Sequence, residues 1–205
     1  MKEIAKSKIT VEECASKKEW DTFITGFKES NFLQSWDFYE FYQSINHQVT
    51  RRVFRCDGKI IAAYAGEVEP AKRGRHLAIA GGPILDWQDH GLVKLVFEDM
   101  KKVATNLRCI FVRVRPQLEN NQDSMQLFKD HNFKKAPMYL SVEYAGILDL
   151  NKTEEEIMAN MRQRLRRALR KTEKNQIKIE TSTDPESIKE FYQIELQTAK
   201  RHSFY

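Results

Sequence analysis

Two spacings of apolar residues alternate along residues 1–150 of the chain. A spacing of two residues, typical of strands with one buried face, repeatedly gives way to the i, i+3, i+4 spacing of amphipathic helices. The expected strands cover residues 8–12, both arms of a hairpin within 49–69, 76–80, 109–114 and 140–150, and the expected helices cover 16–27, 36–44, 91–106 and 124–131. This alternation predicts one core built around a sheet.

The centre of this region predicts a β-hairpin. Asp57 and Gly58 stand between two alternating apolar runs, and an Asp-Gly pair in that position is the strongest short-range hairpin signal. The order β-α-α-β-β-β-α-β-α-β then predicts an α/β fold whose mixed (α+β) sheet carries helices on both faces. This order is similar to that of GNAT-type N-acyltransferases, a resemblance of fold that says little about the substrate.

The pattern restarts after Leu150. Thr153 and Glu156 have the spacing of a capping box, and Asp184-Pro185 is a favoured start for a later helix. Between these two helix starts, residues 177–181 alternate like a strand. A second unit that begins with helix, strand and helix is therefore expected.

A short internal repeat suggests what this second unit is. Ile9 precedes apolar residues of the following helix by 11 and 14 positions, and Ile177 does the same. We therefore expect a first GNAT-like acyltransferase domain over residues 1–150 and the start of a second GNAT-like domain over 151–205. The second domain would lack most of its strands, so the chain is expected to be C-terminally truncated.

The composition predicts a cytoplasmic protein without a metal site. The 205 residues include 41% hydrophobic residues and carry a net charge of +5. The three cysteines are widely spaced and no histidine cluster has metal-ligand spacing, so neither disulfides nor a bound metal are expected. The first residues lack the apolar segment of a signal peptide, and no apolar run reaches the roughly 18 residues of a membrane span.

Most of the positive charge lies in one segment. Seven arginines and lysines fall within residues 162–174, against a single acid, Glu173. If residues 157–174 form one helix, Arg166 and Arg170 line the side opposite an apolar stripe. Like charges four residues apart repel, so this row indicates a polyanionic ligand, with a solvated helix face as the alternative.

Five segments occur in the order found in FemABX-type peptidyltransferases, which the chain resembles from about residue 32 to residue 204. They are FLQSWDFYEFYQSIN, IAGGPILDW, FVRVRP, the run from ILDLNKTEEE through the basic helix, and TAKRHSF. The resemblance implies an aminoacyltransferase that adds an amino acid from aminoacyl-tRNA to the peptide stem of a peptidoglycan precursor. This reaction builds the interpeptide bridge of the cell wall and implies no cofactor, because aminoacyl-tRNA is a co-substrate.

The resemblance also implies substrate-binding residues. They are Trp36 of the SW motif, Gly82 and Asp86 of GPxxD, Arg166 and Arg170 of the RxxIRxA helix associated with the precursor's phosphates, and Arg201 of TAxR. Arg113 and Pro116 match a further R-x-x-P motif. The catalytic residues are unknown and expected beyond Tyr205, so residues 1–205 alone are expected to be inactive. The implied partners are aminoacyl-tRNA, a UDP-linked or lipid-linked muropeptide and, peripherally, the inner face of the membrane.

Four positions depart from the family's pattern. Tyr42 stands where a precursor-binding lysine is usual, and Gly81 stands where the common PRGP has its arginine. Ala168 replaces the asparagine of the basic helix, and Gln176 replaces the glycine that follows it. The amino acid transferred and the acceptor position stay open.

Two other functions remain open from the sequence. One is an acyl-CoA-dependent GNAT N-acyltransferase, although Pro83 removes a backbone donor from the segment that would hold the CoA pyrophosphate. The other is a non-catalytic nucleic-acid-binding module that uses the basic helix. The aromatic residues of 36–42 are interpreted as core rather than as a base-stacking platform. The five histidines, which have no carboxylate partner close in sequence, are interpreted as surface residues.

Overall fold

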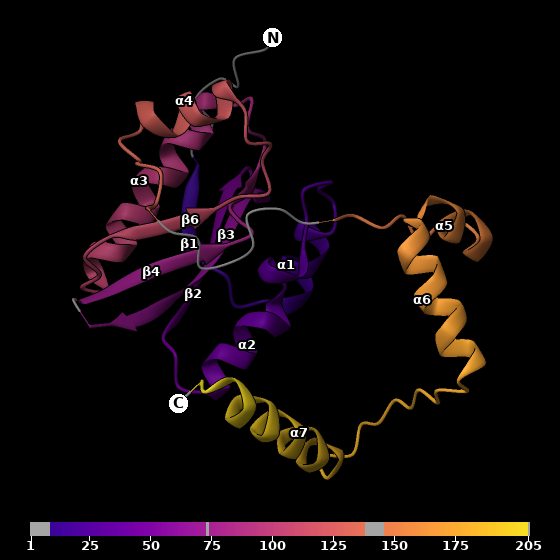
Figure 1. The fold of residues 1–205 in the computed structure, drawn as a ribbon. Coiled ribbons are helices and arrows are strands. Elements are labelled where there is room, and N and C mark those ends of the chain that lie inside the picture. The colour runs from indigo at the N-terminus through magenta and orange to yellow at the C-terminus, as the bar shows by residue number, and fades with distance from the viewer. Residues whose placement is uncertain (1–8, 73, 138–145, 205) are drawn as a thin grey trace. The chain divides into compact units, whose positions relative to one another are not determined.

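The computed structural model describes residues 9–72, 74–137 and 146–204, which fall into two units, Met1–Ser141 and Val142–Tyr205. The first unit is built on a six-stranded sheet (Figure 1). Its spatial order is β1 (Thr10–Glu13), β2 (Val49–Cys56), β3 (Lys59–Ala71), β4 (Gly74–Ala80) and β6 (Val112–Arg115), and the short β5 (Ile84–Leu85) pairs with β3. All pairs are antiparallel except β4 with β6. The predicted mixed sheet is confirmed.

Helices cover both faces of this sheet (Figure 1). One face carries α1 (Lys17–Ile24), a 3-10 turn η1 (Phe32–Gln34) and α2 (Trp36–Ser44), and the other carries α3 (His90–Asn106) and α4 (Gln122–Asp130). The alternation of β3 separates the two cores: Ala63 and Ala65 pack with the α1–α2 side, and Ala62 and Tyr64 pack with the α3 side. The mixed α/β fold class expected from the sequence is therefore observed.

Local signals explain where these elements begin and end. Asp57 and Gly58 both have positive φ, +50° and +78°, as the two central residues of a type I′ hairpin turn require. Ser16 and Ser35 each accept a hydrogen bond from the amide three residues on, at the starts of α1 and α2. The helix expected over 16–27 ends at Ile24, so Phe27 lies beyond it.

The second unit contains three helices in its described part. They are α5 (Glu154–Asn160), α6 (Gln163–Lys174) and α7 (Ser187–His202). The predicted capping box is present, since Thr153 and Glu156 bond each other's backbone amides. None of the helices described in either unit is long and apolar enough to span a bilayer.

Three sequence predictions for this part of the chain need correction or fall outside it. The helix expected to be continuous over 157–174 is broken at Met161 and Arg162, whose ψ angles of 149° and 143° are extended. Residues 177–181 form no strand, because no described segment pairs with them and a lone strand leaves its backbone groups unbonded. Of the strand expected over 140–150, residues 146–150 are not a strand, and residues 140–145 lie outside the described residues.

Candidate functional site

Two of the predicted motifs meet in the first unit although they are far apart in sequence. The Nδ2 atom of Asn31 donates to the carbonyl oxygen of Gly81 at 2.8 Å, and Nε2 of Gln34 donates to that of Ala80 at 2.6 Å. These bonds join η1, which leads into the SW motif, to the turn that carries GPxxD. We call residues 31–36 and 80–86 together the motif junction.

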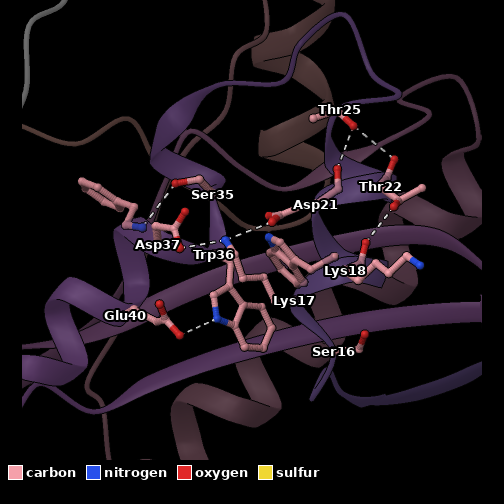
Figure 2. A network of polar contacts seen from close by, with 12 residues as sticks. Ser16, Lys17, Lys18, Asp21, Thr22, Thr25, Ser35, Trp36, Asp37 and Glu40 are labelled. Carbon is pink, nitrogen blue, oxygen red and sulfur yellow. Dashed lines mark hydrogen bonds and ion pairs between the residues drawn. The ribbon is translucent and has the colours of Figure 1, made fainter.

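Trp36 begins α2 and is half-buried at this junction. Its indole Nε1 donates to Glu40 at 2.8 Å, as Figure 2 shows. The guanidinium carbon of Arg51 lies 4.2 Å from the centre of the Trp36 ring, within the range of a cation–π interaction. Lys17 of α1 contacts both Asp21 and Asp37, so it ties α1 to the first turn of α2 (Figure 2). The position of Trp36 is therefore fixed from several elements.

Gly82 and Asp86 differ in their surroundings. The Gly82-Pro83 peptide bond is cis, and Gly82 lies against the side-chain amide of Gln34. Asp86 is exposed, and its carboxylate accepts a hydrogen bond from the amide of Gln88 at 2.9 Å, so it shapes the turn before α3. Beside the junction lies an open pocket of about 290 Å³ between α1 and residues 30–35.

A polar strip that the sequence did not predict lies on the sheet face covered by α1 and α2. It consists of His47, Glu67, His76 and Arg113. Glu67 of β3 is 5% exposed, and its carboxylate lies 2.5 Å from Nδ1 of His47. Burial raises the pKa of Glu67, while hydrogen bonds from His47 and Tyr42 oppose that rise. The histidine thus has a carboxylate partner, 20 residues away in sequence. The available signal was the alternation of β3, which places Glu67 on the face of Ala63 and Ala65.

A second histidine extends this strip. His76 of β4 is 5% exposed and stacks on Phe111 with ring centres 4.6 Å apart. Its Nε2 lies 3.2 Å from the Glu69 carboxylate, but neither ring nitrogen forms a hydrogen bond. Burial lowers the pKa of His76, so the ring is neutral at physiological pH. The interpretation of this histidine as a surface residue was wrong.

Arg113, whose guanidinium lowers the pKa of His76 further, points to the same strip from β6. One of its terminal nitrogens is buried without a hydrogen-bond partner. Pro116 of the same motif follows the end of β6.

In the second unit, Arg166 is engaged at the break between α5 and α6. Its Nη1 donates to the carbonyl oxygens of Ala159 and Met161, at 3.0 and 2.5 Å. These carbonyls close α5 and have no further turn of helix to bond them. On one continuous helix over 157–174, Arg166 would lie free on the polar side. In the structure, one end of its guanidinium caps α5 instead.

The arginines and lysines of α6 and of its N-cap Arg162 form an arc around the helix, without acidic partners among the described residues. None of the seven arginines and lysines of residues 162–174 makes an ion pair with another described residue. In the described part of this unit, the ion pairs join Lys178 with Glu180 and Lys189 with Glu186 instead. Arg170 is exposed on α6, and Arg201 is exposed in the last turn of α7. The arc is available to an anion.

The structure thus divides the predicted substrate-binding residues between the units. Trp36, Gly82 and Asp86 lie in the first unit, where hydrogen bonds from Asn31 and Gln34 join the segment that leads into Trp36 to the turn that carries Gly82. Arg166, Arg170 and Arg201 lie in the second unit. Within the described residues, no group of three histidine, cysteine or acidic side chains has the geometry to hold a metal ion.

The family model described as the FemAB family matches residues 15–136 and 131–205 of this chain. Aminoacyltransferase FemA of Staphylococcus aureus is 24% identical over 192 residues, which cover 82% of this chain and 46% of FemA. The crystal structure of FemX superposes with a TM-score of 0.77 at 19% identity, over 96% of this chain and 51% of FemX. A glucosamine-6-phosphate N-acetyltransferase from Arabidopsis thaliana has a TM-score of 0.49 at 13% identity, over 67% of this chain and 99% of its own. The chain spans about half the length of the FemA and FemX chains.

Proposed function

The chain belongs to the FemAB family, and we propose that it forms the precursor-binding part of an aminoacyltransferase of peptidoglycan synthesis. In the proposed reaction, an amine of the precursor's peptide stem attacks the ester carbonyl of an aminoacyl-tRNA. An amide bond forms, the ester C–O bond breaks, and the amine proton leaves with the departing ribose oxygen or a base. The reaction takes place in the cytoplasm, where aminoacyl-tRNA is available.

Such an acyl transfer needs two polyanionic substrates held in register, a proton acceptor and stabilisation of a tetrahedral oxyanion. We propose that the residues of this chain meet the first of these needs, which is to hold a polyanionic substrate. The motif junction holds the Trp36 ring and the turn of Gly82 in place, where they would contact the muropeptide. The cations of α6 would contact phosphate, either the diphosphate of the precursor or the tRNA backbone.

The observation that carries this proposal is the arc of cations on α6 that has no acidic partner in the described structure. A helix that is merely solvated more often alternates its charges, because like charges four residues apart cost about 0.2–0.5 kcal/mol per pair. Arginine suits a phosphate ligand because its planar fork donates two parallel hydrogen bonds. The family match makes a muropeptide diphosphate the favoured anion.

Calorimetric titration with a UDP-linked muropeptide tests the proposal. Arg170 is the informative position, because it lacks the capping bonds that Arg166 makes to the backbone. Arg170→Ala should weaken binding by about 1.5–3 kcal/mol, the contribution of a hydrogen bond to a charged group. Lys189→Ala removes the same charge from α7 and should bind like the unaltered chain.

Equal affinities for the unaltered chain, Arg170→Ala and Lys189→Ala would contradict the proposal. Tight binding of acyl-CoA in place of the muropeptide would favour an acyl-CoA-dependent N-acyltransferase. Binding of duplex RNA without binding of the muropeptide would favour a nucleic-acid-binding module. A lipid-linked muropeptide in vesicles, titrated in parallel with the UDP-linked form, distinguishes the two precursor classes.

A further inference from the structure

The edge of β3 that faces β4 and β5 has a gap in its hydrogen-bonded ladder. Residues 67–71 of β3 pair with β4, and Ala62 and Ala63 pair with β5. Residues 64–66 lie between these two ladders, opposite the point where the chain leaves β4 at Ala80 and turns into β5. Backbone groups buried in such a gap need other partners, because an unbonded buried amide or carbonyl is destabilising.

The side chain of Gln34 supplies these partners. Its Oε1 accepts from the amide of Ala65 at 2.8 Å, and its Nε2 donates to the carbonyl oxygen of Ala65 at 3.1 Å. The same Nε2 donates across the gap to the carbonyl oxygen of Ala80 at 2.6 Å. A glutamine side chain ends in a carboxamide, so it bonds Ala65 as the peptide group of a neighbouring strand would. Gln34 is fully buried, and the bonding pattern fixes which end of the amide carries the oxygen.

Other buried groups hold Gln34 in this orientation. The indole Nε1 of Trp20 donates to the backbone carbonyl of Gln34 at 2.8 Å. The hydroxyl of Tyr39 donates to the carbonyl oxygen of Ala65 at 2.8 Å and lies 3.3 Å from Nε2 of Gln34. Trp20 and Tyr39 are almost completely buried, so α1 and α2 both restrain the carboxamide.

The turn between β4 and β5 is shaped around this carboxamide. A Cβ atom on Gly82 would lie 2.7 Å from Cδ of Gln34 and 2.8 Å from both of its terminal atoms. Gly81 has φ +71°, and a Cβ there would lie 2.2 Å from the Oδ1 atom of Asn31. Both glycines are needed because the turn approaches the side chains of Asn31 and Gln34 too closely for any larger residue.

We infer that Gln34 is a positioning residue for substrate binding, because its carboxamide bridges Ala65 and Ala80 and packs against Gly82, which fixes the turn between β4 and β5. The role of the turn in substrate binding rests on the proposed function. The contacts of Gln34 with Ala65, Ala80 and Gly82 do not depend on it. Gln34 contacts no substrate itself. It acts through the backbone of Ala80 and through the van der Waals contact with Gly82.

Hydrogen exchange read by mass spectrometry, together with muropeptide binding, tests the inference. Gln34→Met keeps the length of the side chain and removes all its hydrogen bonds. Tyr64→Phe is the matched control, because it removes one partly buried hydrogen bond, to Asp99 at 2.8 Å, from the other face of the same strand. Gln34→Met should speed exchange of the amides in 62–66 and 80–85 and weaken binding, each by about tenfold or more, while Tyr64→Phe leaves both unchanged.

A second set of variants tests the contact without depending on Gln34→Met folding. Gly82→Ala should displace the carboxamide and have the same two effects as losing it. Because both changes break one contact, adding Gly82→Ala to Gln34→Ala should cause little further change, the signature of coupled positions.

The results separate this inference from the proposed function. Unchanged exchange and binding in Gln34→Met, equal changes in Tyr64→Phe, or additive effects of the Gln34 and Gly82 changes would each overturn the role of Gln34. If the unaltered chain binds no muropeptide, the proposed function fails, and the exchange rates alone decide whether Gln34 fixes the turn.

Discussion

At the scale of single residues, His76 makes the stability of the first unit depend on pH. The ring is buried on Phe111, and burial and Arg113 lower its pKa, while Glu69 opposes them. A histidine whose pKa is lower in the folded state contributes stability that is complete above its unfolded pKa of about 6.5. That stability is lost as the pH falls from there through the folded pKa. We expect the free energy of unfolding to fall on acidification below about pH 6.5.

Urea unfolding followed by tryptophan fluorescence measures this effect. His76→Asn should flatten the pH dependence, because asparagine does not titrate. His90→Asn, at an exposed position, should retain the slope of the unaltered chain. The same slope in all three proteins would show that another group is responsible.

Arg166 combines two roles that a single substitution would confuse. Its Nη1 caps the carbonyls of Ala159 and Met161, so Arg166→Ala should fray the end of α5 as well as remove a charge. We expect a local loss of about 1 kcal/mol, below the usual contribution of a charge-assisted bond because the site is partly exposed. Circular dichroism and limited proteolysis around residues 159–163 measure it. Arg170→Ala is the control, and equal fraying in both variants would contradict a capping role.

At the scale of elements, the like charges of α6 destabilise the helix that carries them. Its arginines and lysines at i, i+4 spacing include Arg166 with Arg170 and Arg170 with Lys174. Arg170→Glu would turn both repulsive pairs into attractive ones, each worth about 0.2–0.5 kcal/mol. We therefore expect greater helicity and weaker muropeptide binding from this one change, with the gain in helicity reduced by salt. Loss of both properties together would indicate that Arg170 supports the fold.

Much of the first unit could be predicted from sequence because its signals are local. Ser35 caps α2 and the Asp57-Gly58 turn joins β2 to β3, and both depend on residues within a few positions of each other. The spacing of apolar residues predicts helices over 36–44 and 91–106. The first range matches α2, and the second begins one residue after the start of α3. Interactions of this range are visible in a single sequence.

The parts that were missed depend on contacts between distant residues. The short β5 exists because residues beyond the Gly82-Pro83 turn return to β3, and Gln34 bridges a gap that no local pattern reveals. His47 precedes β2 and meets Glu67 of β3, and His76 of β4 meets Glu69 of β3. Sequence spacing alone could not bring these atoms together.

The corrections in the second unit have a similar cause. The apolar period runs through Met161 without interruption, so the sequence favours one helix over 157–174. The break is stabilised by bonds from the side chain of Arg166, which periodicity does not register. The strand expected over 177–181 required a pairing partner, and alternation along one segment does not supply one.

At the scale of the whole molecule, the first unit has a core of its own on each face of its sheet. Among the described residues, the cluster under α3 and α4 and the cluster under α1 and α2 draw their apolar side chains from residues 9–133. Trp20, Tyr39, Phe54, Tyr64 and Phe97 anchor these clusters with at most 1% exposure. Since folding stability comes mainly from such burial, residues 1–141 should fold without the rest of the chain.

The positions of the tryptophans make this last prediction direct to measure. Trp20, Trp36 and Trp87 are the only tryptophans of the chain, and all three belong to the first unit. Their fluorescence therefore reports unfolding of that unit alone, whatever happens to α5, α6 and α7. We expect residues 1–141 and residues 1–205 to show the same single transition in urea, because the shorter chain keeps every described residue of the two clusters. A lower midpoint or a broader transition in the shorter chain would mean that the second unit contributes to folding of the first. In that case the two units would have to be treated as one cooperative domain.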